Sequence, residues 1–184
     1  MIKRRILTGW ILLVVVAVAW CGVVIFNSVH WTRTVAMRVP EGEIANVWGM
    51  NLKAVSLYSI SSIKNPNGTE EVPSPGAVFV IAVMEYSSDS GTVHCSITLA
   101  GDRRHWDSSR NWFIEYLEPG SLSYCNTADN SGEPTRFGKV AGIFEIPESA
   151  LDEIQGLEVH LVDPTRHFPH ISASRIVILT IHPQ

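Results

Sequence analysis

The sequence lacks the short motifs by which most enzyme classes are identified. It contains no Gly-x-Ser-x-Gly nucleophile elbow, no phosphate-binding loop and no Gly-rich dinucleotide fingerprint. Its carboxylates are scattered: Glu115 and Glu118 would lie side by side only in a helix, which their aromatic surroundings disfavour. Internal repeats and low-complexity tracts are also absent. We therefore expect a protein that is not an enzyme and that has no cofactor and no metal site.

Basic residues are scarce as well. The chain has 14 Lys and Arg against 18 Asp and Glu, a net charge of −4. Three of the basic residues, Lys3, Arg4 and Arg5, precede the first long apolar run. Residues 27–184 therefore contain 11 Lys and Arg and 18 Asp and Glu, which gives them a net charge of −7. Without a basic stripe to contact phosphates, binding to nucleic acid is not expected.

Only three cysteines are present, at positions 21, 95 and 125. Cys21 falls in the apolar run, where we expect it to act as a small apolar side chain. Cys95 and Cys125 form an even pair, and outside the cytoplasm such a pair normally forms a disulfide. The bridge would close a loop of about 30 residues and stabilise the fold by roughly 3–4 kcal/mol. His94 adjoins Cys95 but would point to the opposite face of a strand, which argues against a Cys–His nucleophile.

One long hydrophobic run, ILTGWILLVVVAVAWCGVVIF, occupies residues 6–26. As a helix it would be roughly 31 Å long, which matches the hydrocarbon core of a bilayer. Cleavage after Ala17-Val18-Ala19 and lipidation at Cys21 are alternative interpretations. Cleavage would leave an apolar new terminus, and Trp20 is a poor residue to precede a lipid-modified cysteine. We therefore predict an uncleaved transmembrane signal anchor whose partner is the lipid bilayer.

The charges around this run predict its orientation. Basic residues close to a span remain cytoplasmic, so residues 1–5 should lie inside and the C-terminal part outside. Pro40-Glu41-Gly42 interrupts the next segment, and we expect residues 27–46 to be a juxtamembrane linker. Residues 47–184 are enough for one domain with its own core. The expected location is the cell membrane, with a single span and an extracytoplasmic domain.

That domain has the pattern of an all-β protein. Residues 77–86 are β-rich and nearly continuously apolar, which predicts a central, buried strand. Residues 92–99 alternate, with Val93, Cys95 and the following odd positions facing inward. A bulge is expected in residues 51–60, and a short helical turn at residues 147–154. Seven to eight short strands separated by Gly/Pro turns predict a β-sandwich.

The order of several segments resembles a known family, the small immunoglobulin-like extracytoplasmic domains of Gram-positive bacteria, a group that includes the mycobacterial immunoprotective extracellular protein. The resemblance covers about residues 48–181 and implies an immunoglobulin-like sandwich in the cell envelope, without catalytic residues to transfer. Members of that group are commonly secreted or lipid-anchored, so the predicted span departs from their pattern. The segments that carry the resemblance are residues 78–86, Leu99-Ala-Gly101, Leu117-Glu-Pro-Gly120, Gly142-Ile-Phe-Glu-Ile-Pro147 and Leu157-Glu-Val159.

One predicted loop concentrates Arg and Trp, the residues that dominate binding hot spots. The interpretation that we favour is that both tryptophans pack beneath the loop as a small satellite core, and binding by this loop is the alternative. The close pair His167 and His170 surrounds a proline, and we interpret it as a solvated loop rather than a metal site. The candidate binding residues are Arg103, Arg104, Trp106, Arg110 and Trp112.

The sequence thus favours a membrane-anchored envelope protein whose non-catalytic domain binds an unidentified protein or envelope surface. An extracytoplasmic module that binds or senses a ligand or glycan through residues 103–112 is the alternative.

Overall fold

The computed structural model describes Val16 and residues 18–22, 36–64, 67–89, 93–109, 113–125, 136–168 and 171–183. The chain divides into two compact units, residues 1–35 and residues 36–184. In the first unit the described residues are helical. Most of the predicted span, residues 6–26, lies outside the described residues. Within the described part of the chain, no helix is both long and apolar enough to cross a membrane.

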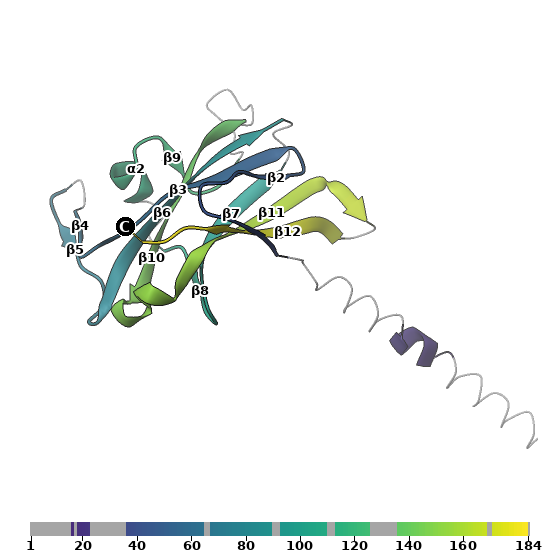
Figure 1. Cartoon of the computed structure of the whole chain (residues 1–184), viewed down its shortest axis with the longest axis horizontal. Helices are drawn as coiled ribbons and strands as arrows, with labels where there is room; N and C mark the ends of the chain where they lie inside the picture. Colours follow the sequence, from purple (N-terminus) through teal and green to yellow (C-terminus); the bar gives the residue numbers. More distant parts are fainter. Residues whose placement is uncertain are drawn as a thin grey trace, which may run out of the picture. The chain divides into compact units, whose positions relative to one another are not determined.

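The second unit is built from β-strands and two short helical turns (Figure 1). Strand β6 lies at the centre of one sheet, as the sequence predicts, and β11 lies at the centre of the other. The elements are β1 (Met37–Val39), β2 (Ala45–Val47), β3 (Met50–Ile60), β4 (Ile63–Lys64), β5 (Glu70–Glu71), β6 (Ala77–Ser88), β7 (His94–Gly101), β8 (His105–Asp107), α2 (Ile114–Leu117), β9 (Ser121–Leu122), β10 (Phe137–Pro147), the 3₁₀ turn η2 (Glu148–Glu153), β11 (Ile154–Phe168) and β12 (Ile171–Thr180).

Two five-stranded sheets form a β-sandwich. Sheet A has the order β1-β12-β11-β7-β8, and sheet B has the order β2-β3-β6-β10-β9. A separate two-stranded ribbon pairs β4 with β5. Most pairs are antiparallel, but β1 runs parallel to β12 and β9 runs parallel to β10. The two sheets therefore hold ten strands rather than seven to eight, because β1, β2, β8 and β9 are edge strands of only two or three residues.

The main core fills the space between the sheets. Alternation along β7 and β11 turns every second side chain inward, where it is removed from water. The inward residues of these strands pack with the inward side of β3 and β6. This core contains Leu52, Leu57, Val80, Ala82, Met84, Cys95, Ile97, Leu99, Leu157, Val159 and Leu161.

The predicted bulge in β3 is present. The pairing of β3 with β6 shifts its register between Ala54 and Ser56, so Val55 is the extra residue. The shift lets Leu52 and Leu57 both point into the main core, although their spacing is odd. Tyr58 consequently faces the outside of sheet B.

The boundary of the domain differs from the sequence prediction. Residues 36–46 belong to the expected linker, yet β1 joins sheet A and Ala45 of β2 joins sheet B. The compact unit therefore begins at Ala36, ahead of the expected start at residue 47. Three-residue edge strands carry too short a pattern to be separated from a connector by periodicity.

Two further segments differ from their expected form. Residues 164–168, expected in a loop, continue β11, where His167 pairs with Ser172 of β12. The helix α2 was not expected, whereas the predicted turn at residues 147–154 is present as η2. His170, the second member of the expected histidine pair, lies outside the described residues.

Candidate functional site

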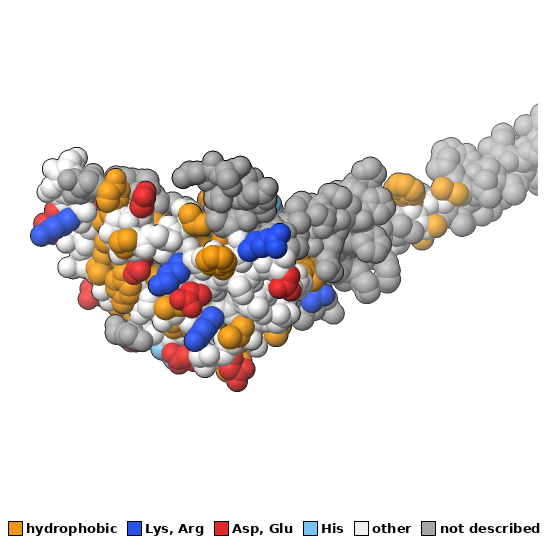
Figure 2. Space-filling model, turned by 90° about the horizontal axis from the view of Figure 1, so that it is seen from above, with side chains coloured by type: hydrophobic (Ala, Val, Ile, Leu, Met, Phe, Trp, Pro, Cys, Tyr) orange, Lys and Arg blue, Asp and Glu red, His pale blue; other side chains and the backbone are white. Residues whose placement is uncertain are grey.

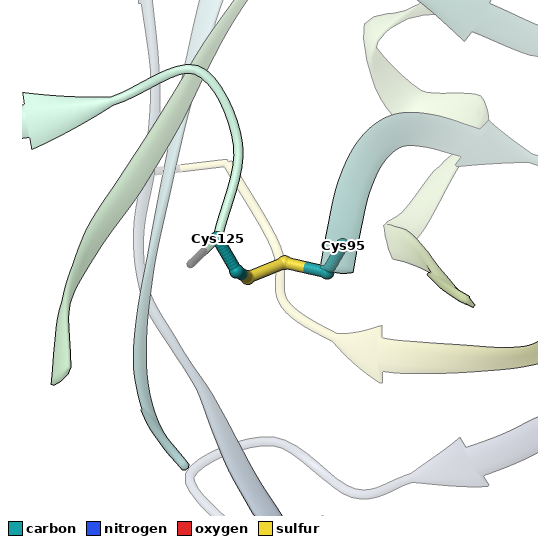
Figure 3. Close-up of a disulfide and its surroundings, with 2 residues drawn as sticks. All are labelled: Cys95 and Cys125. Carbon is teal, nitrogen blue, oxygen red and sulfur yellow. A yellow bond between two sulfur atoms is a disulfide. The ribbon is translucent and has the colours of Figure 1, made fainter. Parts of the chain in front are cut away.

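The predicted disulfide connects the two sheets. Cys95 lies on β7 of sheet A, and Cys125 follows β9 at the edge of sheet B, with Cα atoms 5.0 Å apart (Figure 3). Both cysteines are buried, and the backbone N–H of Cys125 donates a hydrogen bond of 3.2 Å to the carbonyl of Cys95. The bridge thus ties the segment after β9, whose pairing with β10 has two residue pairs, to β7. His94, the neighbour of Cys95, is exposed on the opposite face of β7, as expected.

The predicted binding loop separates into two kinds of residue. Arg103 and Arg104 are exposed in the turn between β7 and β8, where the carbonyl of Arg104 accepts a hydrogen bond of 2.9 Å from the N–H of Gly101. Trp106 is half-buried on β8 and packs against the main core. Its ring lies over Gly101, where an added Cβ would come within 2.8 Å of it. Trp106 thus packs inward, as the favoured interpretation expected, but against the main core rather than a satellite core. Arg110 and Trp112 lie outside the described residues.

A second core lies on the outer face of sheet B. Phe79, Ile81 and Val83 alternate with the inward residues of β6 and are fully buried, so this strand is enclosed on both faces. Phe113, the N-cap of α2, and Ile114, the first residue of α2, cover them. Ile63, Ala141 and Ile143 complete the second core.

Tyr58 and Glu118 close one edge of this second core. The hydroxyl of Tyr58 donates a hydrogen bond of 2.7 Å to Oε1 of Glu118. Burial, followed by the hydrogen bond and the negative charge of Glu118, raises the pKa of Tyr58 above its ordinary value. The phenol consequently remains a hydrogen-bond donor at physiological pH and anchors the segment after α2.

The outer face of sheet A carries a polar cluster that sequence reasoning missed. Glu158 of β11 is only 8 % exposed, although it points away from the main core. Its Oε1 lies 2.7 Å from Nε2 of His160 and its Oε2 lies 3.1 Å from Nδ1 of His105. Thr98 of β7 places its hydroxyl 3.1 Å from the same Nε2 of His160. We call these four residues the Glu158 cluster; the alternation of β11 is the signal that could have placed Glu158 and His160 on one face.

The geometry of the Glu158 cluster does not form a catalytic triad. A triad requires the histidine to contact the nucleophile with one ring nitrogen and the carboxylate with the other. Here Thr98 and Glu158 both lie against Nε2 of His160, so the carboxylate cannot orient the ring while that nitrogen takes a proton from the hydroxyl. Among the residues that the structure describes, no three His, Cys, Asp or Glu side chains form a group able to hold a metal ion.

The remaining half of the outer face of sheet B is an open groove of about 390 Å³, which we call the Phe137 groove. Two rows of paired residues form its floor: Asn51, Ser87 and Phe137 in one, and Lys53, Glu85 and Lys139 in the other. Asn46 and Asn51 continue the first row by a side-chain hydrogen bond of 2.6 Å. Ile44 forms its rim.

Two large apolar side chains stand in water at the Phe137 groove. Phe137 is 79 % exposed and Ile44 is 62 % exposed, far more than the buried aromatic rings of either core. Lys139 and Glu85 approach each other at 4.0 Å, and both remain half-exposed. Figure 2 shows one face of the molecule, on which acidic, basic and hydrophobic side chains are interspersed. The combination of exposed apolar residues with lysines marks this groove as a candidate interaction surface.

No protein-family model matches the chain, and no curated protein matches it. Several solved structures are partly similar to this chain. A conserved hypothetical protein of Bacillus anthracis matches with a TM-score of 0.45 and 10 % identity, over 72 % of this chain and 91 % of its own. The YjhA protein of Bacillus subtilis matches with a TM-score of 0.42 and 9 % identity, over 76 % and 98 %.

A third solved structure, an uncharacterized β-sandwich protein of Clostridium difficile 630, has a TM-score of 0.37 and 12 % identity, over 79 % of this chain and 95 % of its own. Since identities are so low, we transfer no residue role or activity from these proteins to this chain.

Proposed function

We propose that this chain is a single-pass, membrane-anchored protein of the cell envelope, and that its disulfide-bonded sandwich is an immunoglobulin-like, non-catalytic interaction domain outside the cytoplasm. Residues 6–26 would be the anchor, residues 1–5 would lie in the cytoplasm, and the domain from Ala36 onward would face outward.

The single observation that supports this location most directly is the bridge between Cys95 and Cys125. Buried disulfides persist where the surroundings are oxidising and are rare in the cytosol. This bridge joins two sheets through the interior and closes a loop with a sequence separation of 30. Reducing conditions would therefore remove a substantial part of the stability of the domain.

The apolar run and its flanking charges support the anchor independently of the fold. Ile6 to Phe26 is long enough to cross a bilayer as a helix, and Lys3, Arg4 and Arg5 immediately precede it. An excess of positive charge on the N-terminal side keeps that side in the cytoplasm.

A binding role fits the surface better than catalysis does. The Glu158 cluster pairs its groups with one another rather than with an open site, because Glu158 contacts both histidines. The Phe137 groove instead offers exposed apolar and basic side chains to a partner. Among the described residues of this loop, Arg103 and Arg104 remain available for a ligand or glycan, because Trp106 contributes to the core.

The test uses the full chain with a C-terminal epitope, expressed in cells. We expect it to remain in the membrane after an alkaline carbonate wash, since a spanning helix is not displaced by high pH. Protease added to intact cells should remove the epitope, because the domain lies outside. Release of the chain by carbonate, or protection of the epitope until the cells are lysed, would contradict the proposal.

A further inference from the structure

We propose that the Phe137 groove rests on the phospholipid headgroups of the membrane that holds the anchor, with a preference for anionic lipid. This inference rests on the proposed function, because it requires the chain to be anchored. It adds an orientation to that function: the outer face of sheet B at the N-terminal end of the sandwich would face the bilayer.

The register of the strands places the groove at the end of the domain where the chain enters. Met37 pairs with Val177, and β1 runs parallel to β12. Residue 36, where the chain enters the domain, therefore lies beside the part of β12 that precedes Val177. Arg175, two residues before Val177, lies over the ring of Trp48 at 5.3 Å from its centroid.

Trp48 belongs to the tight turn that joins β2 to β3. Trp48 has φ of 55° and Gly49 has φ of 75°, as expected for a two-residue hairpin turn. Met50 follows and pairs with Ser88, and the next residue, Asn51, pairs with Ser87. Phe137 lies opposite Ser87 on β10. The entry point and Phe137 therefore share one end of the sandwich.

The tether is short enough to keep this end near the bilayer. Residues 27–35 separate the apolar run from the domain and reach at most roughly 32 Å when fully extended. A surface held within that distance meets the membrane at a high effective concentration, so even a weak contact is populated.

The side chains of the groove suit a headgroup layer. Phe137 and Ile44 are the kind of large apolar residue that inserts at the boundary between headgroups and acyl chains. Lys53 and Lys139 outnumber Glu85 in the lining, which gives the groove a net charge of +1 within a region whose net charge is −7. Arg136 and Glu43, the chain neighbours of Phe137 and Ile44, cancel each other. Asp89, beside Gly49, adds one negative charge at this end of the sandwich. The lining of the groove is still more positive than the domain as a whole, which favours contact with anionic lipid.

The experiment places a photoreactive benzophenone analogue of phenylalanine at position 137 of the full chain, reconstituted in nanodiscs of phosphatidylcholine with or without phosphatidylglycerol. A matched chain carries the same group at position 162, because Val162 of β11 is 39 % exposed and pairs with His94 on the outer face of the other sheet. After illumination, mass spectrometry measures the adducts with lipid and with protein.

We expect lipid adducts several-fold more abundant at position 137 than at position 162, and more abundant with phosphatidylglycerol. The changes Lys53→Ala and Lys139→Ala should each reduce the adducts by about fivefold in the anionic nanodiscs. Equal adducts at both positions, no lipid adduct at position 137, or adducts mainly with a second copy of the chain would each overturn the inference. A chain that remains in the nanodisc without such adducts refutes only this orientation, whereas a chain that fails to remain in the nanodisc refutes the anchor as well.

Discussion

The outer face of sheet B is apolar at Phe79, Ile81 and Val83, whereas the outer face of sheet A carries hydroxyl, imidazole and carboxylate groups across β7 and β11. The apolar face is covered by Phe113 and Ile114, and the polar face satisfies its groups by contacts within the sheet. The comparison shows how the sequence of a strand determines whether its outer face must be covered by a second layer of the protein. A strand that is apolar at consecutive positions requires a second layer, while an alternating strand can leave one face in water.

The largest effect is expected from uncovering the apolar face. Phe113→Ala removes a fully buried ring from the second core and should lower the free energy of unfolding by about 3–5 kcal/mol. Urea denaturation of the full chain in detergent, followed by near-ultraviolet circular dichroism, measures this change. Tyr116→Ala provides the control, because Tyr116 is exposed nearby. Equal losses from the two variants would mean that the segment before α2 does not cover sheet B.

The next effect concerns the link between the two sheets. Replacing both Cys95 and Cys125 by serine should lower the free energy of unfolding by about 3–4 kcal/mol, because the unfolded chain loses its cross-link. The same denaturation assay measures the loss, and Cys21→Ser serves as the control outside the bridge. An unchanged midpoint in the double variant, compared without reductant, would contradict a stabilising bridge.

A smaller effect is expected on the polar face. Glu158→Gln retains the shape of the side chain but removes the charge that contacts His105 and His160, and should cost about 1–3 kcal/mol. His105→Ala should cost at most about 1 kcal/mol, because the His105 side chain is 57 % exposed. Thermal unfolding of the two variants beside the unmodified chain compares them. A larger loss for His105→Ala than for Glu158→Gln would show that the carboxylate is not the centre of the cluster.

The smallest effect is expected in the Phe137 groove. Phe137→Ser should change the free energy of unfolding by no more than about 0.5 kcal/mol, since its ring is 79 % exposed. A loss comparable to that of Phe113→Ala would identify Phe137 as a core residue and remove the groove from consideration as an interaction surface. The measurement is the same urea denaturation of the full chain.

Much of the sandwich was predictable from alternation and turn residues. Three features follow from the residue pattern within a single strand: the inward-facing residues of β7, the bulge of β3 and the burial of β6. The edge strands β1 and β2 were not predictable, because three residues do not establish a period. The helix α2 has four residues, too few to show a helical pattern against its aromatic neighbours.

The candidate sites were less accessible to sequence reasoning. Cys95 and Cys125 could be paired because only two cysteines lie beyond the apolar run. The Glu158 cluster joins residues from β7, β8 and β11, and the Phe137 groove joins β3, β6 and β10. Such neighbours depend on strand order and register, which a local pattern does not specify. Inward packing of Trp106 was expected from the sequence, but its place against the main core depends on the pairing of β8 with β7.

The central claim is that a disulfide-bonded domain lies outside the membrane that anchors it. Because the bridge is buried, the most direct measurement treats intact cells expressing the full chain with a membrane-impermeant thiol reagent, before and after an impermeant reductant applied with enough urea to open the domain, and determines the mass of the purified protein. We predict that Cys95 and Cys125 are modified only after reduction, and without lysis of the cells. Two thiols that are modified without reductant, and only after lysis, would contradict both the oxidised bridge and the outward orientation.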